Sequence, residues 1–107
     1  MKIGILKETQ KGEKRVAITP NIAKQLIENG FEVIVEENAG SSSSYNNSDY
    51  EKVGAKIERR AVVFKNSAIL IKINPFDEDD LKLVDKEHIL ISQLFVLFFT
   101  TICKYLY

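Results

Sequence analysis

The stretch "TPNIAKQLIENGFEVIVE" (residues 19–36) decides the fold of this chain. Thr19 is a preferred residue type for a helix cap, and Pro20 suits the first position of a helix. Apolar residues then recur at helical spacing, at Ile22, Ala23, Leu26 and Ile27. Gly30 can end this helix in the left-handed conformation, and the branched run "FEVIVE" that follows it predicts a strand. A short apolar strand, "KIGIL", precedes the helix at residues 2–6. The order strand, helix, strand favours a parallel pair of strands with a right-handed crossover.

The same alternation continues along the chain. After a loop at 38–48, the sequence predicts a short helix over 49–53, with Ser48 as its cap and Gly54 at its end. A strand at 55–58 and a short helix around 59–65 follow. The last predicted elements are a buried strand at 68–73, an acidic helical turn at 76–84 and a strand at 88–92. In the acidic turn we expect Leu81 and Val84 to face inward. Alternating strands and helices predict a doubly wound α/β fold with a mostly parallel sheet, Rossmann-like or flavodoxin-like. Ligands bind such folds at the carboxyl ends of the strands, which places the loop at 7–19 on the expected functional edge.

Composition excludes several classes of function. The chain has 107 residues, enough for one domain. Fifteen basic and fifteen acidic residues cancel, so net charge gives no support for nucleic acid as a partner. Cys103 is the only cysteine, which rules out an intrachain disulfide and fits a reducing compartment. The N-terminus lacks the apolar core of a secretory signal, so we predict none.

Residues 93–107 break the alternation. The segment "LFVLFFTTICKYLY" (94–107) has no turn signal, no helix cap and no obvious polar face. We interpret it as a tail that departs from the domain at 1–92, through truncation or an altered reading frame. A buried segment and a membrane span are the alternatives, although a span needs about 20 apolar residues. The nucleotide sequence after the codon for Gln93 tests this interpretation, since another frame should restore a polar, proline-containing continuation.

Four stretches carry a resemblance to a known family. In order they are "MKIGILKET", "GEKRVAITP", "GFEVIVEENAGSSSSYNNSDYEKVGAKI" and "ILIKINPFDEDDLKL". Together they resemble the N-terminal domain shared by alanine dehydrogenase and the α subunit of the proton-translocating nicotinamide nucleotide transhydrogenase. The resemblance covers about residues 1–92, and it is specific because its motifs recur at fixed separations. It implies that the chain is one domain of an oxidoreductase.

The resemblance implies three positions for the substrate site of an alanine dehydrogenase, and this chain matches one of them. In alanine dehydrogenases an arginine and a lysine grip the keto acid and a histidine moves a proton, and Arg15 matches the arginine. Asn74 stands at the lysine position, and an ungapped continuation puts Phe95 at the histidine position. Transhydrogenase α subunits show K-V-N at this strand, and "KIN" (72–74) is similar. The resemblance therefore favours a transhydrogenase, in which hydride passes between NAD(H) and NADP(H). An alanine dehydrogenase relative and a non-catalytic remnant or interaction module are the alternatives.

The resemblance also implies what the chain works with. The NAD site of the family belongs mainly to a following Rossmann domain, and no glycine-rich G-x-G-x-x-G fingerprint occurs in this chain. We therefore expect no bound cofactor and no catalytic residue in the chain alone, and no activity without that domain. The implied partners are this NAD-binding domain and other transhydrogenase subunits, in a homodimer. The implied location is the cytoplasmic or matrix side, peripheral to a membrane.

Three residues are candidates for contact with a substrate or a neighbouring domain. Arg15 can bind a carboxylate or phosphate, or it can pair with Glu8 or Glu13 and fix the loop. Lys72 lies in an apolar run, so we expect it near the end of its strand, reaching solvent or an acid. Asn74 marks the end of that strand, on the ligand edge.

Other conspicuous residues have simpler interpretations. Lys7 and Glu8 predict a structural ion pair. The serines at 41–44 predict a flexible solvated loop rather than a phosphate cradle. The carboxylates at 77–80 predict a helix start stabilised by its dipole rather than a cation site. His88 has no second histidine or nearby cysteine, so we expect a residue at a strand edge and no metal site.

Overall fold

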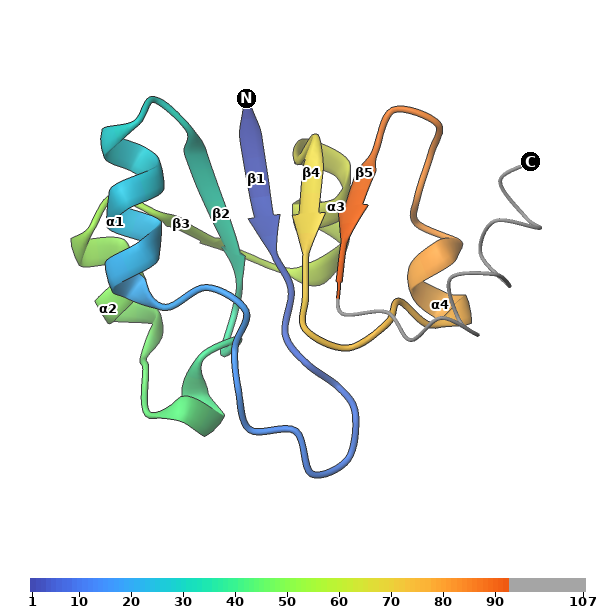
Figure 1. Cartoon of the computed structure of the whole chain (residues 1–107), viewed down its shortest axis with the longest axis horizontal. Helices are drawn as coiled ribbons and strands as arrows, with labels where there is room; N and C mark the ends of the chain where they lie inside the picture. The colour runs from blue at the N-terminus through green and yellow to red at the C-terminus, as the bar shows by residue number, and fades with distance from the viewer. Residues whose placement is uncertain (93–107) are drawn as a thin grey trace.

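The computed structural model describes residues 1–92, which form a five-stranded parallel sheet with helices on both faces (Figure 1). The strands are β1 (Lys2–Ile5), β2 (Glu32–Glu36), β3 (Lys56–Glu58), β4 (Ile69–Ile71) and β5 (Ile89–Ile91). The helices are α1 (Pro20–Glu28), α2 (Asn47–Lys52), α3 (Arg60–Asn66) and α4 (Glu78–Leu81), with a 3₁₀ turn, η1 (Ser41–Ser43). The predictions for Phe95 and for the tail at 93–107 lie outside the described residues.

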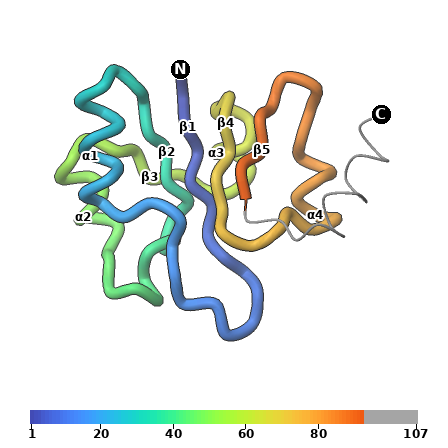
Figure 2. The backbone as a smooth tube through the Cα atoms, viewed as in Figure 1, coloured from blue at the N-terminus to red at the C-terminus, as the bar shows by residue number. Residues whose placement is uncertain are grey.

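The strand order confirms the doubly wound fold. The sheet runs β3-β2-β1-β4-β5, and every neighbouring pair is parallel. The chain builds outward from β1 to β3 on one side and then returns to add β4 and β5 on the other, as the tube in Figure 2 shows. The direction of winding reverses between β1 and β4. The loops that leave these two strands flank the place where α/β sheets bind ligands.

Each face of the sheet has its own core. Alternate residues of the central strands point to opposite faces, because side chains in a strand alternate. On the face of α1, Ala23 packs with Ile3, Ile5, Val33 and Val35. On the face of α3, the buried residues are Leu6, Ile34, Val63, Phe64, Leu70 and Phe76. Two separate cores hold helices on both faces, so the central strands are buried on both sides.

The start and end of α1 follow the sequence prediction. Thr19 caps the helix, and its hydroxyl accepts a hydrogen bond from the Ile22 amide at 3.5 Å. Gly30 follows the helix with φ of 94°, a conformation that favours glycine. The tight link from α1 to β2 is thus confirmed.

Some predicted details are wrong. Asn46, rather than Ser48, caps α2, because the Asn46 amide donates to the Asp49 carboxylate at 2.8 Å and closes a capping box. The serines at 41–44, predicted as a solvated loop, are mostly exposed but include the 3₁₀ turn η1, and the Ser43 hydroxyl donates to the Lys14 carbonyl. The strand predicted over 68–73 spans only Ile69–Ile71.

The acidic turn turns a different residue toward the core than the sequence predicts. Val84 packs against the core beneath α3, as expected, but Leu81 is 41% exposed. Asp80 is buried in its place. The reason is electrostatic, because α4 is a single turn whose inward position meets two cations, Arg60 and Lys72. No helix within residues 1–92 is long and apolar enough to cross a bilayer.

Gly4 lets α3 approach the sheet closely. It pairs in register with Ile34 and Leu70, and a Cβ at this position would lie 2.8 Å from Val63 and nearer still to the Ser67 hydroxyl. We expect Gly4→Ala to lower the free energy of unfolding by about 1–3 kcal/mol through overpacking. Urea unfolding measures the loss. The Ser67 hydroxyl is buried with no hydrogen-bond partner among the described residues. Ser67→Ala should therefore recover part of the loss, and an unchanged Gly4→Ala variant would contradict the packing.

Tyr50 ties α2 to the start of α1. Its side chain is buried, and its hydroxyl donates to the Ile18 carbonyl at 2.7 Å. Burial, with smaller effects of Tyr45 and Asp49, raises the pKa of Tyr50 to about 12. We expect Tyr50→Phe to cost about 1 kcal/mol near neutral pH, the usual value of one hydrogen bond.

The same shift predicts an alkaline loss of stability. Because the folded pKa of Tyr50 lies above the unfolded pKa of about 10, its contribution is complete below pH 10 and is lost as the pH rises toward 12. Urea unfolding of Tyr50→Phe should therefore depend less on pH in this window than unfolding of the unmodified chain. Tyr45→Phe, which alters a partly buried neighbour, is the control, and equal slopes for the two variants would refute the assignment.

Candidate functional site

The candidate site lies where the loops after β1 and β4 leave the sheet. The loop from β1 to α1 carries Glu8, Glu13 and Arg15, and the loop from β4 to α4 carries Lys72 and Asn74. Both loops leave the carboxyl ends of adjacent parallel strands, so they meet at the point where the winding reverses.

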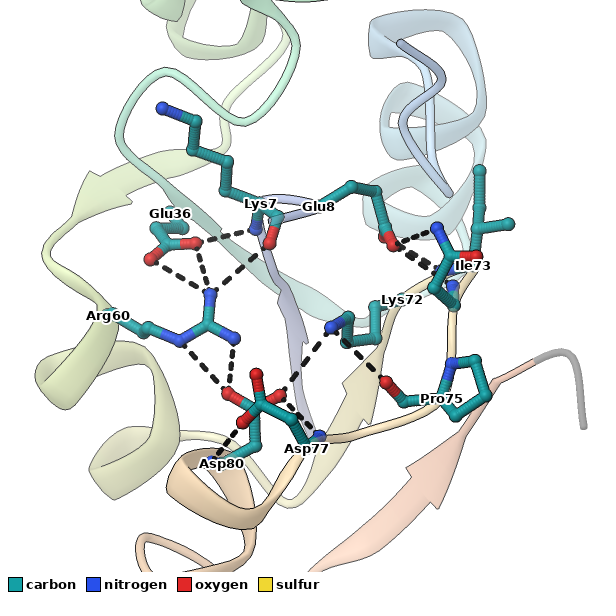
Figure 3. Close-up of polar contacts among 10 residues, drawn as sticks. Lys7, Glu8, Glu36, Arg60, Lys72, Ile73, Pro75, Asp77 and Asp80 are labelled. Atoms are coloured by element: carbon teal, nitrogen blue, oxygen red, sulfur yellow. Dashed lines mark hydrogen bonds and ion pairs between the residues drawn. The ribbon is translucent and has the colours of Figure 1, made fainter. Parts of the chain in front are cut away.

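Glu8 joins the two loops directly. Its carboxylate accepts hydrogen bonds from the backbone amides of Ile73 and Asn74, at 2.8 and 3.0 Å, and from the Asn74 side chain at 3.2 Å. Figure 3 shows the Glu8 carboxylate pointing at the Ile73 segment. Glu8 itself is only 8% exposed. A buried carboxylate with three donors is well satisfied, so this contact fixes the two loops relative to each other.

Glu13 accepts hydrogen bonds from polar groups of both loops. It accepts from the Arg15 amide and Nε at 2.9 Å each, from the Arg15 Nη2 at 3.0 Å and from the Asn74 Nδ2 at 3.1 Å. The hydrogen bonds from Arg15 and Asn74 lower the pKa of Glu13 to about 2. The Glu13 carboxylate in turn raises the pKa of Arg15. We call Glu8, Glu13, Arg15 and Asn74 the loop clamp.

The loop clamp contains two of the predicted residues. Arg15 pairs with Glu13, which is one of the structural partners proposed for it. Asn74 lies on the ligand edge as predicted, and Glu13 connects it to Arg15. The predicted ion pair between Lys7 and Glu8 is wrong, because Glu8 is used by backbone amides and Lys7 makes no ion pair within residues 1–92.

A second set of charges lies behind the clamp. Glu36 ends β2, Arg60 begins α3, Lys72 follows β4 and Asp80 lies in α4. The Arg60 Nη1 is 2.9 Å from the Glu36 carboxylate, and its other nitrogens donate to Asp80. The Lys72 Nζ is 3.5 Å from Asp80 and equally far from the Pro75 carbonyl. Glu36, Arg60, Lys72 and Asp80 form the ion-pair network, drawn in Figure 3.

The ion-pair network also holds the exit of β1. The Lys7 amide donates to Glu36 at 2.6 Å, and Arg60 donates to the Lys7 carbonyl at 3.2 Å. Burial alone would raise the pKa of Asp80, but hydrogen bonds from Arg60 and the Asp77 amide lower the pKa below its usual value. Burial likewise acts to lower the pKa of Arg60, and the contacts with Asp80 and Glu36 raise it overall. Each buried charge of the network therefore has a partner of opposite sign.

Lys72 belongs to the network and not to the clamp. Its side chain is 2% exposed, and in Figure 3 it is turned toward Asp80 and Pro75, away from Glu8. The prediction that Lys72 reaches an acid is confirmed, and the alternative of solvent is wrong. The structure thus brings Arg15 and Asn74 together and leaves the third candidate in a separate cluster.

Sequence reasoning missed most of the ion-pair network. Glu36 and Arg60 had a usable signal, since both stand at the carboxyl edge, one ending a strand and the other opening a helix. Nothing in the acidic run at 77–80 distinguishes Asp80 from its exposed neighbours, because the register of a single helical turn is set by tertiary contacts.

The described residues offer little to hold a cofactor or metal. No group of three or more histidine, cysteine or acidic residues within residues 1–92 could hold a metal ion. His88 lies just before β5, where its Nδ1 accepts from the Asp85 amide at 3.0 Å and its Nε2 lies 2.7 Å from the Phe64 carbonyl. A pocket of about 320 Å³ lined by Lys2, Glu32 and Lys56 lies at the amino ends of the strands, away from the loop clamp.

Known proteins resemble the chain over most of its length. The family model described as "Alanine dehydrogenase/PNT, N-terminal domain" matches residues 4–100. The alanine dehydrogenase of Staphylococcus epidermidis is 37% identical over 94 residues, which cover 88% of this chain and 25% of that protein. A solved L-alanine dehydrogenase matches with a TM-score of 0.83 and 26% identity, over 88% of this chain and 26% of the other. A solved transhydrogenase from Sinorhizobium meliloti matches with a TM-score of 0.83 and 28% identity, over 88% and 28%.

These matches agree with the fold described above. The chain spans about a quarter of the length of these relatives. Both dehydrogenase and transhydrogenase structures share its fold, so the fold alone does not separate the two. Because the family model covers residues 4–100 of 107, the chain belongs to the alanine dehydrogenase/PNT N-terminal domain family.

Proposed function

We propose that this chain is the N-terminal domain of a transhydrogenase α subunit, whose parent protein transfers hydride between NAD(H) and NADP(H). The observation that carries the proposal is the pattern of hydrogen bonds within the loop clamp. Asn74 stands where an alanine dehydrogenase would place a lysine, and Arg15 and Asn74 both donate to Glu13. An uncharged amide and a guanidinium already paired with a carboxylate are poor ligands for a keto acid carboxylate.

The charges around Asn74 support the same proposal. Glu8 and Glu13 both approach its side chain, so an incoming carboxylate would meet two negative groups. Lys72, the nearest lysine in this loop, is engaged by Asp80. Transhydrogenation needs no keto acid, because hydride passes from one nicotinamide to the other. A site in which Glu8 and Glu13 already engage the polar side chains is therefore compatible with transhydrogenation.

Alanine dehydrogenase is the second candidate. The match of 37% identity with the enzyme of Staphylococcus epidermidis favours it, and Arg15 is kept at the substrate position of that family. Under this reading Glu13 would have to release Arg15 before a keto acid could bind. The two candidates therefore predict opposite behaviour of Arg15 when pyruvate is added.

The partners and the location are part of the proposal. A following NAD-binding Rossmann domain and other transhydrogenase subunits would complete the site, with NAD(H) and NADP(H) as the cofactors of the parent in a homodimer. The parent would lie on the cytoplasmic or matrix side, peripheral to the membrane. The domain would span residues 1–92, with 93–107 as a departing tail. As a non-catalytic remnant, the chain would keep the same fold without these partners.

The proposal predicts that the isolated chain is inactive, since hydride transfer needs a bound and oriented nicotinamide. Purified chain, with its fold checked by circular dichroism, is titrated with NADH and followed by nucleotide fluorescence. It is also assayed for NADH oxidation with pyruvate and for reduction of NAD by L-alanine. We expect neither tight binding nor turnover. Micromolar affinity for NADH would overturn the inactivity, and turnover with pyruvate or L-alanine would favour the alanine dehydrogenase candidate.

A further inference from the structure

The only histidine in the sequence joins the end of α3 to the turn that precedes β5. The side chain of His88 is 6% exposed. Its Nδ1 is 3.0 Å from the Asp85 amide, and its Nε2 is 2.7 Å from the Phe64 carbonyl. Figure 1 shows this segment, between α4 and β5, at the same end of the sheet as the N-terminus. We call residues 85–88 the histidine turn.

The two contacts of the ring fix its protonation. A backbone amide can only donate and a carbonyl can only accept, so Nδ1 is the bare nitrogen and Nε2 carries the hydrogen. Only the neutral imidazole with its hydrogen on Nε2 satisfies both contacts at once. The histidine turn, as the structure has it, therefore belongs to the uncharged form of His88.

The Phe64 carbonyl obtains a hydrogen-bond donor from this ring. It belongs to the last turn of α3, and the carbonyls of a last turn lack partners inside their helix. The Ala68 amide would reach it in a longer helix, but that amide donates to the Lys2 carbonyl at 2.9 Å. The ring of Phe64 also meets the imidazole edge-on, with ring centroids 6.4 Å apart. His88 therefore caps the carboxyl end of α3 from a distant part of the chain.

Charged groups lie on both elements that the ring contacts. In the histidine turn, the Asp85 carboxylate is 3.7 Å from Nδ1, and Lys86 and Glu87 are exposed. On α3, Arg60 is held by two carboxylates of the ion-pair network, and Lys65 is exposed. Within residues 1–92, the Asp85 carboxylate is thus the one acidic partner of the ring.

We propose that His88 is a proton-operated switch, in which protonation of Nδ1 exchanges the Asp85 amide for the Asp85 carboxylate. A protonated Nδ1 is a donor, so it cannot bond the amide, which is also a donor. The carboxylate has to approach by only about 1 Å to reach the usual length of a charge-assisted hydrogen bond. The same oxygen accepts from the Glu87 amide at 2.8 Å, so the approach changes that contact too. Nε2 keeps its hydrogen in both forms, and a cation at the carboxyl end of a helix is favourable.

The switch makes the start of β5 sensitive to pH. Histidine side chains change charge between about pH 5 and 8. The histidine turn leads directly into β5, where the Ile89 amide donates to the Ala68 carbonyl at 2.9 Å. The switch therefore acts on an edge strand at the amino end of the sheet, whereas the loop clamp lies at the carboxyl ends of the strands. This inference does not depend on the proposed function.

NMR of the full chain labelled with nitrogen-15 tests the switch between pH 8 and pH 5. Because the sequence has one histidine, every imidazole signal belongs to His88. We expect hydrogen on Nε2 alone at pH 8 and on both ring nitrogens at pH 5. The amide signals of Asp85 and Glu87 should shift with the same midpoint as the ring. The Ile73 amide, which donates to Glu8, is the internal control and should not follow the ring.

Two variants assign the shifts to the proposed contacts. His88→Gln has no titrating ring but keeps a side-chain donor for the Phe64 carbonyl, so both amide shifts should vanish. Asp85→Ala keeps the ring and the backbone amide, so the ring and the amide at position 85 should still titrate while the Glu87 amide no longer follows them. The proposal is overturned by a ring that stays in one form, or by a ring that gains a proton without moving the two amides. Amide shifts that persist in His88→Gln, a Glu87 shift that persists in Asp85→Ala, or an Ile73 amide that follows the ring would overturn it equally.

Discussion

Replacing Asp80 with alanine is expected to lower the free energy of unfolding by about 3–5 kcal/mol, the usual cost of removing one partner from a buried ion pair. The change leaves the Lys72 ammonium, which is 2% exposed, without its carboxylate, and it removes one of the two acidic partners of Arg60. It also removes the capping contact with the Asp77 amide at the start of α4. Urea unfolding followed by circular dichroism measures the loss.

The neighbouring acidic residue is the matched control. Asp79 lies in the same helical turn, but its side chain is 92% exposed and its ion pair with Lys82 spans 3.6 Å. We expect Asp79→Ala to change stability by less than about 0.5 kcal/mol, as exposed ion pairs usually do. Lys72→Met in the Asp80→Ala background should recover part of the loss, because it removes the stranded ammonium. Equal effects of the two single variants would refute the network.

The network also predicts how stability responds to acid. The folded pKa of Asp80 is lowered, so its contribution is present above the unfolded pKa of about 3.9 and is lost as the pH falls through the folded value. Asp80→Asn lacks this titration. Its stability should therefore change less with pH below 4 than the stability of the unmodified chain.

Glu8→Ala is the second large expected effect, with a loss of about 2–4 kcal/mol in the free energy of unfolding. The change strands the amides of Ile73 and Asn74, which both donate to the Glu8 carboxylate in a part-buried setting. It leaves the two loops joined by the contact between Glu13 and the Asn74 side chain at 3.1 Å, because no other side chain bonds both of these amides among the described residues. Glu8→Gln keeps one acceptor oxygen, so we expect a smaller loss.

Amide hydrogen exchange distinguishes this local effect from a general one. In Glu8→Ala the amides of Ile73 and Asn74 should exchange faster by more than the loss of global stability accounts for. Glu32→Ala is the control, since Glu32 is exposed and its ion pair with Lys2 spans 3.8 Å. Unchanged exchange at Ile73 would contradict the clamp.

Local signals predicted most of the fold. The cap at Thr19, the glycine at 30 and the branched run after it are short-range features, and each is confirmed because the physics that selects them is local. The alternation of elements then led to the doubly wound sheet. The identity of the α2 cap was wrong because asparagine and serine are both good caps, and the side chain of Asp49 decides between them.

The candidate site was less predictable from sequence. Its edge of the sheet and two of its residues followed from topology, since loops after parallel strands meet there. The contacts within it join residues 61 positions apart, as between Asn74 and Glu13, or 66 apart, as between Asn74 and Glu8. No short-range pattern encodes such pairs. The sequence predicts Asp80 only as one of four acids at a helix start stabilised by its dipole, and its burial against Arg60 and Lys72 depends on tertiary contacts.

The side chains of Arg15 and Asn74 offer the most direct measurement. Glu13 accepts hydrogen bonds from both, so a keto acid carboxylate should find no free partner in either side chain. The Arg15 Nε and Asn74 Nδ2 signals of nitrogen-labelled chain are followed by NMR while pyruvate is added, with chloride at equal ionic strength as the control. We predict that neither signal moves beyond the chloride control. A saturable shift of both signals with pyruvate alone would contradict the account and favour an alanine dehydrogenase site.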